Sequence, residues 1–231
     1  MQYRHIFFDL DHTLWDFDTN SREALLDIYH SLSLADAGVD DFDLFHKLYL
    51  GHNERLWEKY RNGHMKVDEL RWKRMAVTLL EFKNGDEALA RKMGVAFLDI
   101  LPTKNKLFSG TIEVLNYLKE KKYSLHIITN GFEITQHQKL ATSGIEKYFQ
   151  EVITSEGSNS LKPHPEIFEF ALQKTGAAKK ESIMIGDAPE VDILGAKRAG
   201  IDQVYVNHIQ NREMVDSTYT IFHLDELKDI L

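Results

Sequence analysis

The feature of this sequence that most restricts its fold is a series of short apolar runs, each of which stops at polar residues and is separated from the next by helical stretches. The runs are Ile6–Phe8, Leu125–Ile128, Val152–Ile153, Ile183–Ile185 and Val204–Val206. Unbroken apolar runs of this length are typical of strands that are buried on both faces of a sheet. Because strands alternate with helices, the sequence predicts an α/β fold, in which a parallel sheet with right-handed crossovers is covered by helices on both faces.

A long helical insert interrupts this pattern directly after the first predicted strand. Residues 17–101 show four helical stretches and no convincing strand. Asn20 and Glu23 have the spacing of a capping box, which predicts that the first of these helices begins there. The domain organisation that we expect is therefore an α/β core, made of residues 1–16 and 102–231, with an all-helical domain inserted between its two parts.

The composition excludes several classes of function. The absence of cysteine removes thiol nucleophiles, thiolate zinc sites and disulfides, and it is compatible with a reducing compartment. The net charge of −8, without a basic block, argues against a nucleic-acid polymer as partner. No apolar run approaches the roughly 20 residues of a membrane span, and the acidic residues close to Met1 argue against a signal peptide. We therefore expect a soluble, cytoplasmic protein with no membrane partner.

Acidic residues follow the predicted strands. Asp9 and Asp11 come after the first run and Asp187 after the fourth, with Asp192 five residues further on. Ligands of open parallel sheets bind beyond the carboxyl ends of the strands, so these segments can converge on one edge. Clustered carboxylates need a cation or a shared proton, and oxygen ligands favour Mg²⁺. Each Asp alone is more typically a turn former or a helix cap, but their convergence favours a metal site.

A second set of polar residues suits an anion. Thr129-Asn130-Gly131 joins the end of the second predicted strand to a helix, where a hydroxyl and backbone N–H groups can bind an anion. Lys162 precedes Pro163, so we expect its backbone to be extended, and its ammonium could hold a phosphate oxygen. Alone, the first segment is typically a turn and a Lys is typically solvated, so the interpretation depends on the neighbouring acids.

These segments, taken in their order along the chain, are similar to the motifs of a known family. Asp9-Leu10-Asp11-His12-Thr13 resembles the first motif of the haloacid dehalogenase-like (HAD) hydrolases. Thr129, Lys162 and Gly186-Asp187, the last with Asp192, resemble the second, third and fourth motifs. The resemblance implies a Rossmann-like core and magnesium-dependent hydrolysis of phosphate monoesters, and the insert resembles the four-helix cap domain of this family. Residues 8–14, 16–18, 56–60, 63, 69–71 and 129–132 resemble the pyrimidine 5'-nucleotidase branch.

The resemblance also implies roles for individual residues. Asp9 is expected to be the nucleophile that forms an aspartyl-phosphate, and Asp11 the general acid and base. Mg²⁺ is expected to bind Asp9, the backbone carbonyl of Asp11 and Asp187, with support from Asp192. The residues expected to bind the phosphate oxygens are Thr129, Asn130, Gly131 and Lys162.

The insert is expected to close over the core and to supply specificity. Its aromatic residues Trp57, Tyr60 and Trp72 could stack on a nucleobase, although aromatic residues at helical spacing more typically pack a domain's own core. Two departures from the family pattern stand out. His12 occupies a position where the superfamily usually has Gly, and Asn159 replaces a Gly in the loop before Lys162, where Asn can still adopt a left-handed conformation.

Three functions remain open at this point. The favoured one is a magnesium-dependent phosphatase for small phosphorylated metabolites, in particular a 5'-nucleotidase for nucleoside monophosphates, acting as a monomer or a homodimer. The second is another enzyme on the same scaffold, a phosphoglycolate or sugar-phosphate phosphatase or a phosphomutase. A haloacid dehalogenase is less favoured, because its leaving halide needs no proton and Asp11 would have no role. The third is a binding module without catalysis, which the intact set of acids disfavours.

Overall fold

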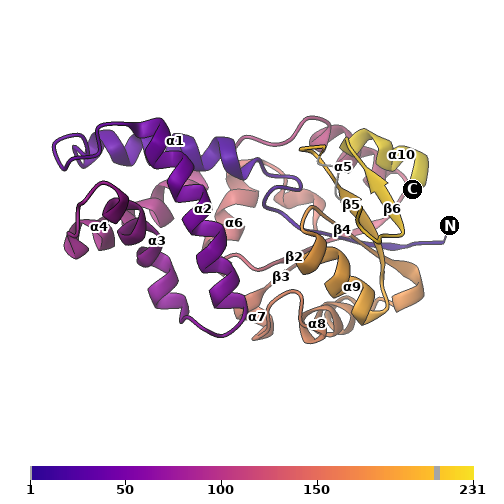
Figure 1. The fold of residues 1–231 in the computed structure, drawn as a ribbon. Coiled ribbons are helices and arrows are strands. Elements are labelled where there is room, and N and C mark those ends of the chain that lie inside the picture. Colours follow the sequence, from indigo (N-terminus) through magenta and orange to yellow (C-terminus); the bar gives the residue numbers. More distant parts are fainter. Residues whose placement is uncertain (1, 211–213) are drawn as a thin grey trace. The chain divides into compact units, whose positions relative to one another are not determined.

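The computed structural model describes residues 2–210 and 214–231, and the chain divides into two compact units (Figure 1). One unit contains residues 1–17 and 105–231, and the other contains residues 18–104. The first unit holds the sheet and the second is helical.

The sheet has six strands in the order β3-β2-β1-β4-β5-β6, and every neighbouring pair is parallel. The strands are β1 His5–Phe8, β2 Ser124–Thr129, β3 Glu151–Thr154, β4 Ser182–Gly186, β5 Asp202–Val206 and β6 Tyr219–Ile221. The chain adds β2 and β3 on one side of β1 and then crosses to the other side with β4. The topological switch point, where ligands of such folds bind, therefore lies between β1 and β4. The predicted Rossmann-like α/β fold is confirmed.

The centre of the sheet is apolar because β1 is covered on both faces. Ile6, Phe7 and Phe8 are all fully buried. Phe8 lies in register with Ile127 of β2 and Ile185 of β4, so the carboxyl ends of three strands lie at the same edge within two residues of one another. The short β6 was not predicted, since Tyr219–Ile221 offers only three residues and no apolar run.

Helices cover both faces of this sheet, with α8 and α9 below the strands and α5 and α10 above them in the view of Figure 1. The α-helices of this unit are α5 Thr111–Glu120, α6 Glu133–Thr142, α7 Ser155–Ser158, α8 Pro165–Thr175, α9 Leu194–Ala199 and α10 Leu227–Ile230. Short 3₁₀ turns span Glu146–Tyr148, Lys179–Glu181 and Leu224–Glu226. The helix predicted after the fourth strand begins as a π-helix, Pro189–Ile193, before α9 continues it.

The helical unit contains α2 Phe42–Arg61, α3 Val67–Glu81, α4 Glu87–Ile100 and most of α1 Phe17–Ser31; a 3₁₀ turn, Leu101–Thr103, follows α4. Asp41 and Asp86 cap α2 and α4 by accepting hydrogen bonds from the backbone N–H groups of Leu44 and Leu89, at 2.9 and 3.0 Å. Tyr49 and Phe97 pack in its core with ring centroids 5.5 Å apart. None of the helices in the described parts of the chain combines the length and apolarity that crossing a bilayer requires.

The predicted start of the first helix is wrong. Helix α1 begins at Phe17, so Asn20 lies inside the helix, fully buried, and does not cap it. The reason is the buried face of this helix, on which Phe17, Ser21, Ala24 and Ile28 follow one another at steps of four, three and four residues. This face extends the helix one turn further back than the capping-box spacing suggests.

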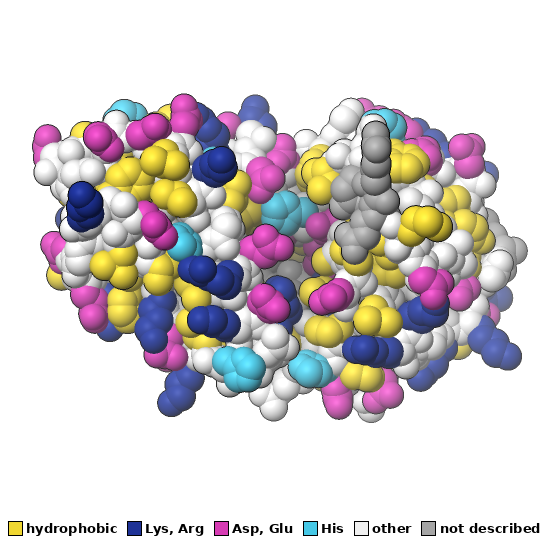
Figure 2. All heavy atoms as spheres, in the orientation of Figure 1, with side chains coloured by type: hydrophobic (Ala, Val, Ile, Leu, Met, Phe, Trp, Pro, Cys, Tyr) yellow, Lys and Arg dark blue, Asp and Glu magenta, His cyan; other side chains and the backbone are white. Residues whose placement is uncertain are grey.

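Charged side chains of both signs are interspersed on the face of the molecule that Figure 2 shows, and neither sign forms a large continuous field there. This surface fits the sequence composition, in which 36 acidic residues are accompanied by 28 basic ones. It resembles the surface of an ordinary globular protein more than that of a polyanion-binding protein.

Candidate active site

Three carboxylates meet at the switch point of the sheet. Asp9 follows β1 directly, and its backbone N–H donates to the carbonyl of Ile185 on β4 at 2.9 Å. Asp187 follows β4, and Asp192 lies in the π-helix behind it. Asp9, Asp187 and Asp192, called the acid cluster below, each offer an oxygen within 4.8 Å of the others. Adjacent strand ends thus bring together residues that are far apart in the sequence.

The backbone around Gly186 fixes the third member of the cluster. Asp192 is 1% exposed and accepts a hydrogen bond at Oδ2 from the backbone N–H of Ala188, at 3.1 Å. A Cβ atom on Gly186 would lie only 2.4 Å from that same oxygen. Glycine is therefore required at position 186 for the carboxylate of Asp192 to approach the end of β4.

One buried ammonium joins two of the three acids. The Nζ atom of Lys162 donates to Oδ1 of Asp9 at 2.5 Å and to Oδ1 of Asp192 at 2.7 Å. Lys162 is 1% exposed, and burial alone would lower its pKa. The carboxylates of Asp192 and Asp9 outweigh burial and hold the pKa of Lys162 above its usual range, so this side chain is an ammonium.

The acid cluster carries more negative charge than Lys162 balances. Burial, above all, raises the pKa of Asp9 well above its usual range, and nearby carboxylates add to the effect of burial. Burial and the charge of Asp192 raise the pKa of Asp187 to about 8, although the hydroxyl of Thr13 donates to its Oδ1 at 3.0 Å. When all three acids are ionised, as in the presence of a cation, three carboxylates against one ammonium leave a formal charge of −3 + 1 = −2. This oxygen-rich donor set fits a hard divalent cation in both charge and chemistry.

Asp11 lies beside this cluster, and its side chain belongs to a different set of contacts. Its Oδ1 accepts from Nζ of Lys139 at 2.6 Å, and its Oδ2 accepts from Nε2 of Gln136 at 2.8 Å. Burial would raise the pKa of Asp11, but the ion pair with Lys139 and the hydrogen bond from Gln136 outweigh burial and lower it. Asp11 is therefore a carboxylate held by helix α6.

The turn around Asp11 explains the first departure from the family pattern. His12 has φ of +63°, in the left-handed region that favours glycine. A histidine at this position adopts the backbone that the usual glycine would adopt. Asn159, in the loop before Lys162, has φ of +52°, so the prediction that asparagine keeps this turn left-handed is confirmed.

The segment after β2 is held by hydrogen bonds from its own side chains. Thr129 is 2% exposed, and its Oγ1 accepts from the backbone N–H of Gly131 at 3.1 Å. The side chain of Asn130 donates to the carbonyl of Lys162 and accepts from its backbone N–H, both at 2.8 Å. The side-chain amide of Asn130 thus holds the loop that carries Lys162, while the binding of an anion by Asn130 and the backbone N–H groups of this turn stays a prediction.

Two of the predicted substrate-binding residues lie in the helical unit. Trp57 and Tyr60 belong to α2, and their rings contact each other edge to face with centroids 5.7 Å apart. This contact is what aromatic residues at helical spacing commonly make within a small domain. Their proposed role in stacking on a base stays a prediction.

No role in the site was predicted for Thr13, which lies within the first motif, or for Gln136 and Lys139. Gln136 and Lys139 are three residues apart in α6, so they lie on the same face of a helix that was correctly predicted. The available signal was this spacing directly after the Thr129-Asn130-Gly131 turn. It was missed because Gln and Lys in a helix are typical of an exposed face, whereas both are buried here.

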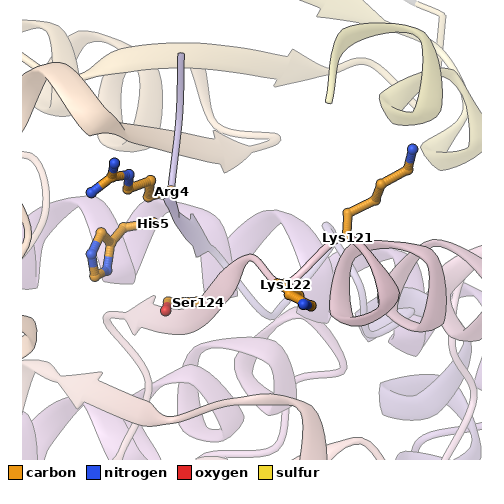
Figure 3. A pocket seen from close by; sticks show the side chains of 5 residues that line it. All are labelled: Arg4, His5, Lys121, Lys122 and Ser124. Carbon is orange, nitrogen blue, oxygen red and sulfur yellow. The ribbon is translucent and has the colours of Figure 1, made fainter. Parts of the chain in front are cut away.

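A hollow lies at the opposite edge of the sheet, where β1 and β2 begin. It is lined by Arg4, His5, Lys121, Lys122 and Ser124 (Figure 3). The side chains in Figure 3 do not converge, since Arg4 and His5 point away from Lys121. This hollow offers no carboxylate, so the acid cluster is the better candidate for an active site.

Comparisons with known proteins agree with this geometry. The chain is 32% identical over 234 residues to pyrimidine 5'-nucleotidase PynA of Streptococcus pneumoniae, and the alignment covers 100% of this chain and 96% of that protein. It is 30% identical over 240 residues to a glyceraldehyde 3-phosphate phosphatase of Methanothermobacter thermautotrophicus, with 98% of each chain covered.

Among solved structures, the HAD-hydrolase YfnB of Bacillus subtilis, bound to magnesium, matches with a TM-score of 0.89 and 28% identity. The match covers 100% of this chain and 99% of that one. Residues 3–200 match the family described as haloacid dehalogenase-like hydrolase. The resemblance seen in the four sequence motifs is thereby confirmed: the chain belongs to the haloacid dehalogenase-like hydrolases.

Proposed function

We propose that this hydrolase is a magnesium-dependent phosphatase that acts on small phosphate monoesters, with nucleoside 5'-monophosphates as the favoured substrates. The observation that carries the proposal is the position of Asp9, which lies at the switch point of the sheet between the ammonium of Lys162 and two further carboxylates. A carboxylate in such surroundings can attack phosphorus as a nucleophile. The relatives named as nucleotidases and phosphatases support the same reaction class.

The reaction proceeds in two displacements. In the first, an oxygen of Asp9 forms a bond to phosphorus while the bond from phosphorus to the leaving oxygen breaks. Asp11 is a carboxylate in the free protein, so it must first take up a proton, which it then gives to the leaving oxygen. In the second, Asp11 removes a proton from water, the water oxygen attacks the aspartyl-phosphate at phosphorus, and Asp9 is released together with inorganic phosphate. Asp11 ends each cycle protonated, ready for the next leaving group.

The residues that would hold Mg²⁺ are Asp9, Asp187 and the backbone carbonyl of Asp11, with Asp192 in support. The ion would offset the negative charge that otherwise opposes the approach of a carboxylate to an anionic ester. Lys162 has the charge and Thr129 the hydroxyl to bind the oxygens of the transferred phosphoryl group. Asn130 contributes indirectly, because its side chain fixes the backbone of Lys162.

The choice of substrate is assigned to the inserted domain, residues 17–101 in the expected division of the chain. Trp57 and Tyr60 are its candidate groups for stacking on a base. A sugar-phosphate phosphatase is the second candidate, and the 30% identity to a glyceraldehyde 3-phosphate phosphatase favours it. The proposal includes a cytoplasmic location and a monomeric or homodimeric state, both of which remain predictions.

A phosphate-release assay tests the proposed function. The panel contains pyrimidine and purine nucleoside 5'-monophosphates, glyceraldehyde 3-phosphate and phosphoglycolate, each with Mg²⁺ and with EDTA. We expect release that depends on Mg²⁺, with the highest kcat/KM for a nucleoside monophosphate. Preference for glyceraldehyde 3-phosphate would select the second candidate, transfer of phosphate within the substrate would indicate a mutase, and no release from any ester would contradict the proposal.

A further inference from the structure

Both carboxylate oxygens of Asp11 are bound by side chains of a single helix. Lys139 and Gln136 of α6 donate to Oδ1 and Oδ2, at 2.6 and 2.8 Å. Asp11 and these two residues are separated by 128 and 125 positions in the sequence. Two bonds to different oxygens fix both the position and the rotation of a carboxylate, which one bond cannot do.

The two donors are more deeply buried than an ordinary helix surface allows. Gln136 is 1% exposed and Lys139 is 2% exposed. Removing an ammonium from water is costly unless a counter-charge and further contacts stabilise it. The carboxylate of Asp11 is the counter-charge of Lys139. The centroid of the Trp15 ring lies 4.3 Å from the Nζ atom of Lys139, which adds a cation–π contact. The ring of Phe17 lies 5.6 Å from the same atom, so Lys139 is held from several sides.

The turn before α6 is shaped to let Gln136 reach Asp11. A Cβ atom on Gly131 would lie 1.5 Å from Nε2 of Gln136, the atom that donates to Asp11. Gly131 does not have a positive φ, so its backbone conformation would accept other residues. The requirement for glycine is therefore one of space, and it connects the Thr129-Asn130-Gly131 turn to the side chain of Asp11.

We propose that Gln136 and Lys139 are positioning residues, which hold the carboxylate of Asp11 in the orientation in which it exchanges a proton with the leaving oxygen and with water. This inference rests on the proposed function, in which Asp11 is the general acid and base. Asp11 lies in a turn beyond the end of β1 and not in the strand itself, so the sheet alone does not fix its side chain. A misplacement of about 1 Å in such a group can cost about 10²-fold in rate.

The test uses variants that remove each donor and keep its length, with a matched control for each. Lys139→Met keeps the aliphatic stem and removes the ammonium; its control is Lys147→Met, an exposed lysine that also lies over a ring, that of Tyr148 at 5.2 Å. Gln136→Met is paired with Gln138→Met, an exposed residue of the same helix. Thermal unfolding of all four proteins verifies that they fold.

The discriminating measurement is rapid mixing with two kinds of ester in Mg²⁺. Departure of 4-nitrophenolate needs no proton, so with 4-nitrophenyl phosphate only the second displacement depends on Asp11. We expect the rate constant of the first-turnover burst in Lys139→Met and Gln136→Met to stay within about threefold of the wild-type value. The steady-state rate of both variants should fall by about 10- to 10²-fold. With an alkyl phosphate, the first turnover itself should slow by a similar factor.

If Gln136 and Lys139 only stabilised the fold, their loss would also slow the first displacement. It would disturb Asp9 and Lys162 as well, so the burst with 4-nitrophenyl phosphate would slow in proportion to the steady state, which would overturn the inference. In the double variant with Asp11→Asn, we expect a rate within about threefold of Asp11→Asn alone, because positioning has no effect when the positioned group is absent. Multiplicative losses would contradict the inference.

The outcomes separate this inference from the proposed function. If the wild type is active and Asp11→Asn is slow, while Lys139→Met behaves like Lys147→Met, the positioning role is overturned and the phosphatase proposal stands. If the wild type hydrolyses no ester, both are overturned. If Lys139→Met does not fold, Gln136→Met decides: a retained burst with a slow steady state supports the inference, and rates equal to those of Gln138→Met overturn it.

Discussion

Asn130 and Lys162 form a two-point hydrogen-bonded pair, in which the side-chain amide of Asn130 binds both the backbone carbonyl and the backbone N–H of Lys162, each at 2.8 Å. The pair resembles one rung of a sheet, with a side chain in place of a second backbone. It connects the carboxyl end of β2 to the loop that delivers the ammonium to the acid cluster. The side chain of Asn130 therefore helps to position the Lys162 ammonium among the acids, although the two hydrogen bonds of this pair are made with the backbone of Lys162.

We expect Asn130→Ala to destabilise the protein by about 1–3 kcal/mol, because it leaves two backbone groups of Lys162 without their partners. The same change should lower kcat, since the ammonium is no longer held in one place. Urea unfolding and phosphate release measure the two effects. Asn116→Ala is the control, because it removes a hydrogen bond with Tyr148 at an exposed position. A variant with normal kcat would show that Lys162 is placed by other contacts.

Asp9→Asn should reduce hydrolysis to the background of the assay while the protein remains folded, because an amide is not a nucleophile toward phosphorus. Asp192 still provides a carboxylate for Lys162 in this variant. Phosphate release and circular dichroism are measured together, with the exposed Asp229→Asn as control. Near-normal turnover by Asp9→Asn would refute its assignment as nucleophile.

Asp11→Asn should slow turnover of alkyl phosphates by about 10²–10⁴-fold, the usual contribution of a positioned acid and base. The asparagine can still accept a hydrogen bond from α6, so the variant tests proton transfer more than packing. Steady-state kinetics with a nucleoside monophosphate measures the change. An unchanged rate would mean that another group moves the proton.

Mg²⁺ should stabilise the folded protein, because the acid cluster and Lys162 together carry a formal charge of −2. A ligand at about 100 times its Kd adds about 2.7 kcal/mol to the free energy of unfolding. We expect a rise in Tm on addition of Mg²⁺ and its reversal by EDTA. Asp187→Asn should abolish this rise, whereas the exposed Glu169→Gln should keep it. An equal rise in both variants would place the ion elsewhere.

Acid should destabilise the sheet through His126. This side chain is buried in β2, its ring stacks on Phe7, and one of its nitrogens lies 3.2 Å from a ring nitrogen of His5. Burial, together with the charge of His5, lowers the pKa of His126 from 6.5 to about 4. Between these values the unfolded chain binds more protons than the folded one, so the free energy of unfolding falls as the pH falls from 6.5 to 4.

His126→Phe should reduce this pH dependence, since a phenyl ring keeps the stacking and binds no proton. Urea unfolding at pH 7 and pH 5 measures it, with the exposed His64→Phe as control. The same slope in wild type and His126→Phe would assign the acid sensitivity to other groups.

The main architecture could be predicted because its signals are local. Apolar runs such as Ile183–Ile185 identify strands without knowledge of the fold, and the rule for parallel sheets then places Asp9 and Asp187 at one edge. The four sequence motifs identified the family for the same reason. Helix α6, Glu133–Thr142, was predicted to follow the Thr129-Asn130-Gly131 turn, because the strand and the turn before it are both easily recognised.

The features that were missed depend on contacts distant in the sequence. Lys139 has the appearance of a surface residue until Asp11, 128 positions away, is known to lie beside it. Asn20 and Glu23 have capping spacing, yet the burial of Phe17 determines where α1 begins. The hydrogen bonds of Asn130 were not predicted because their partner, the backbone of Lys162, has no sequence signature.

The order in which the chain builds its sheet has a consequence for the newly made protein. Asp9 leaves the ribosome well before its partners Lys162, Asp187 and Asp192, which follow it by more than 150 positions in the chain. Until β4 has joined β1, the early carboxylate has neither its ammonium nor its companion acids. A nascent or truncated polypeptide that ends before Asp192 therefore lacks the assembled centre, however well its first strands have formed.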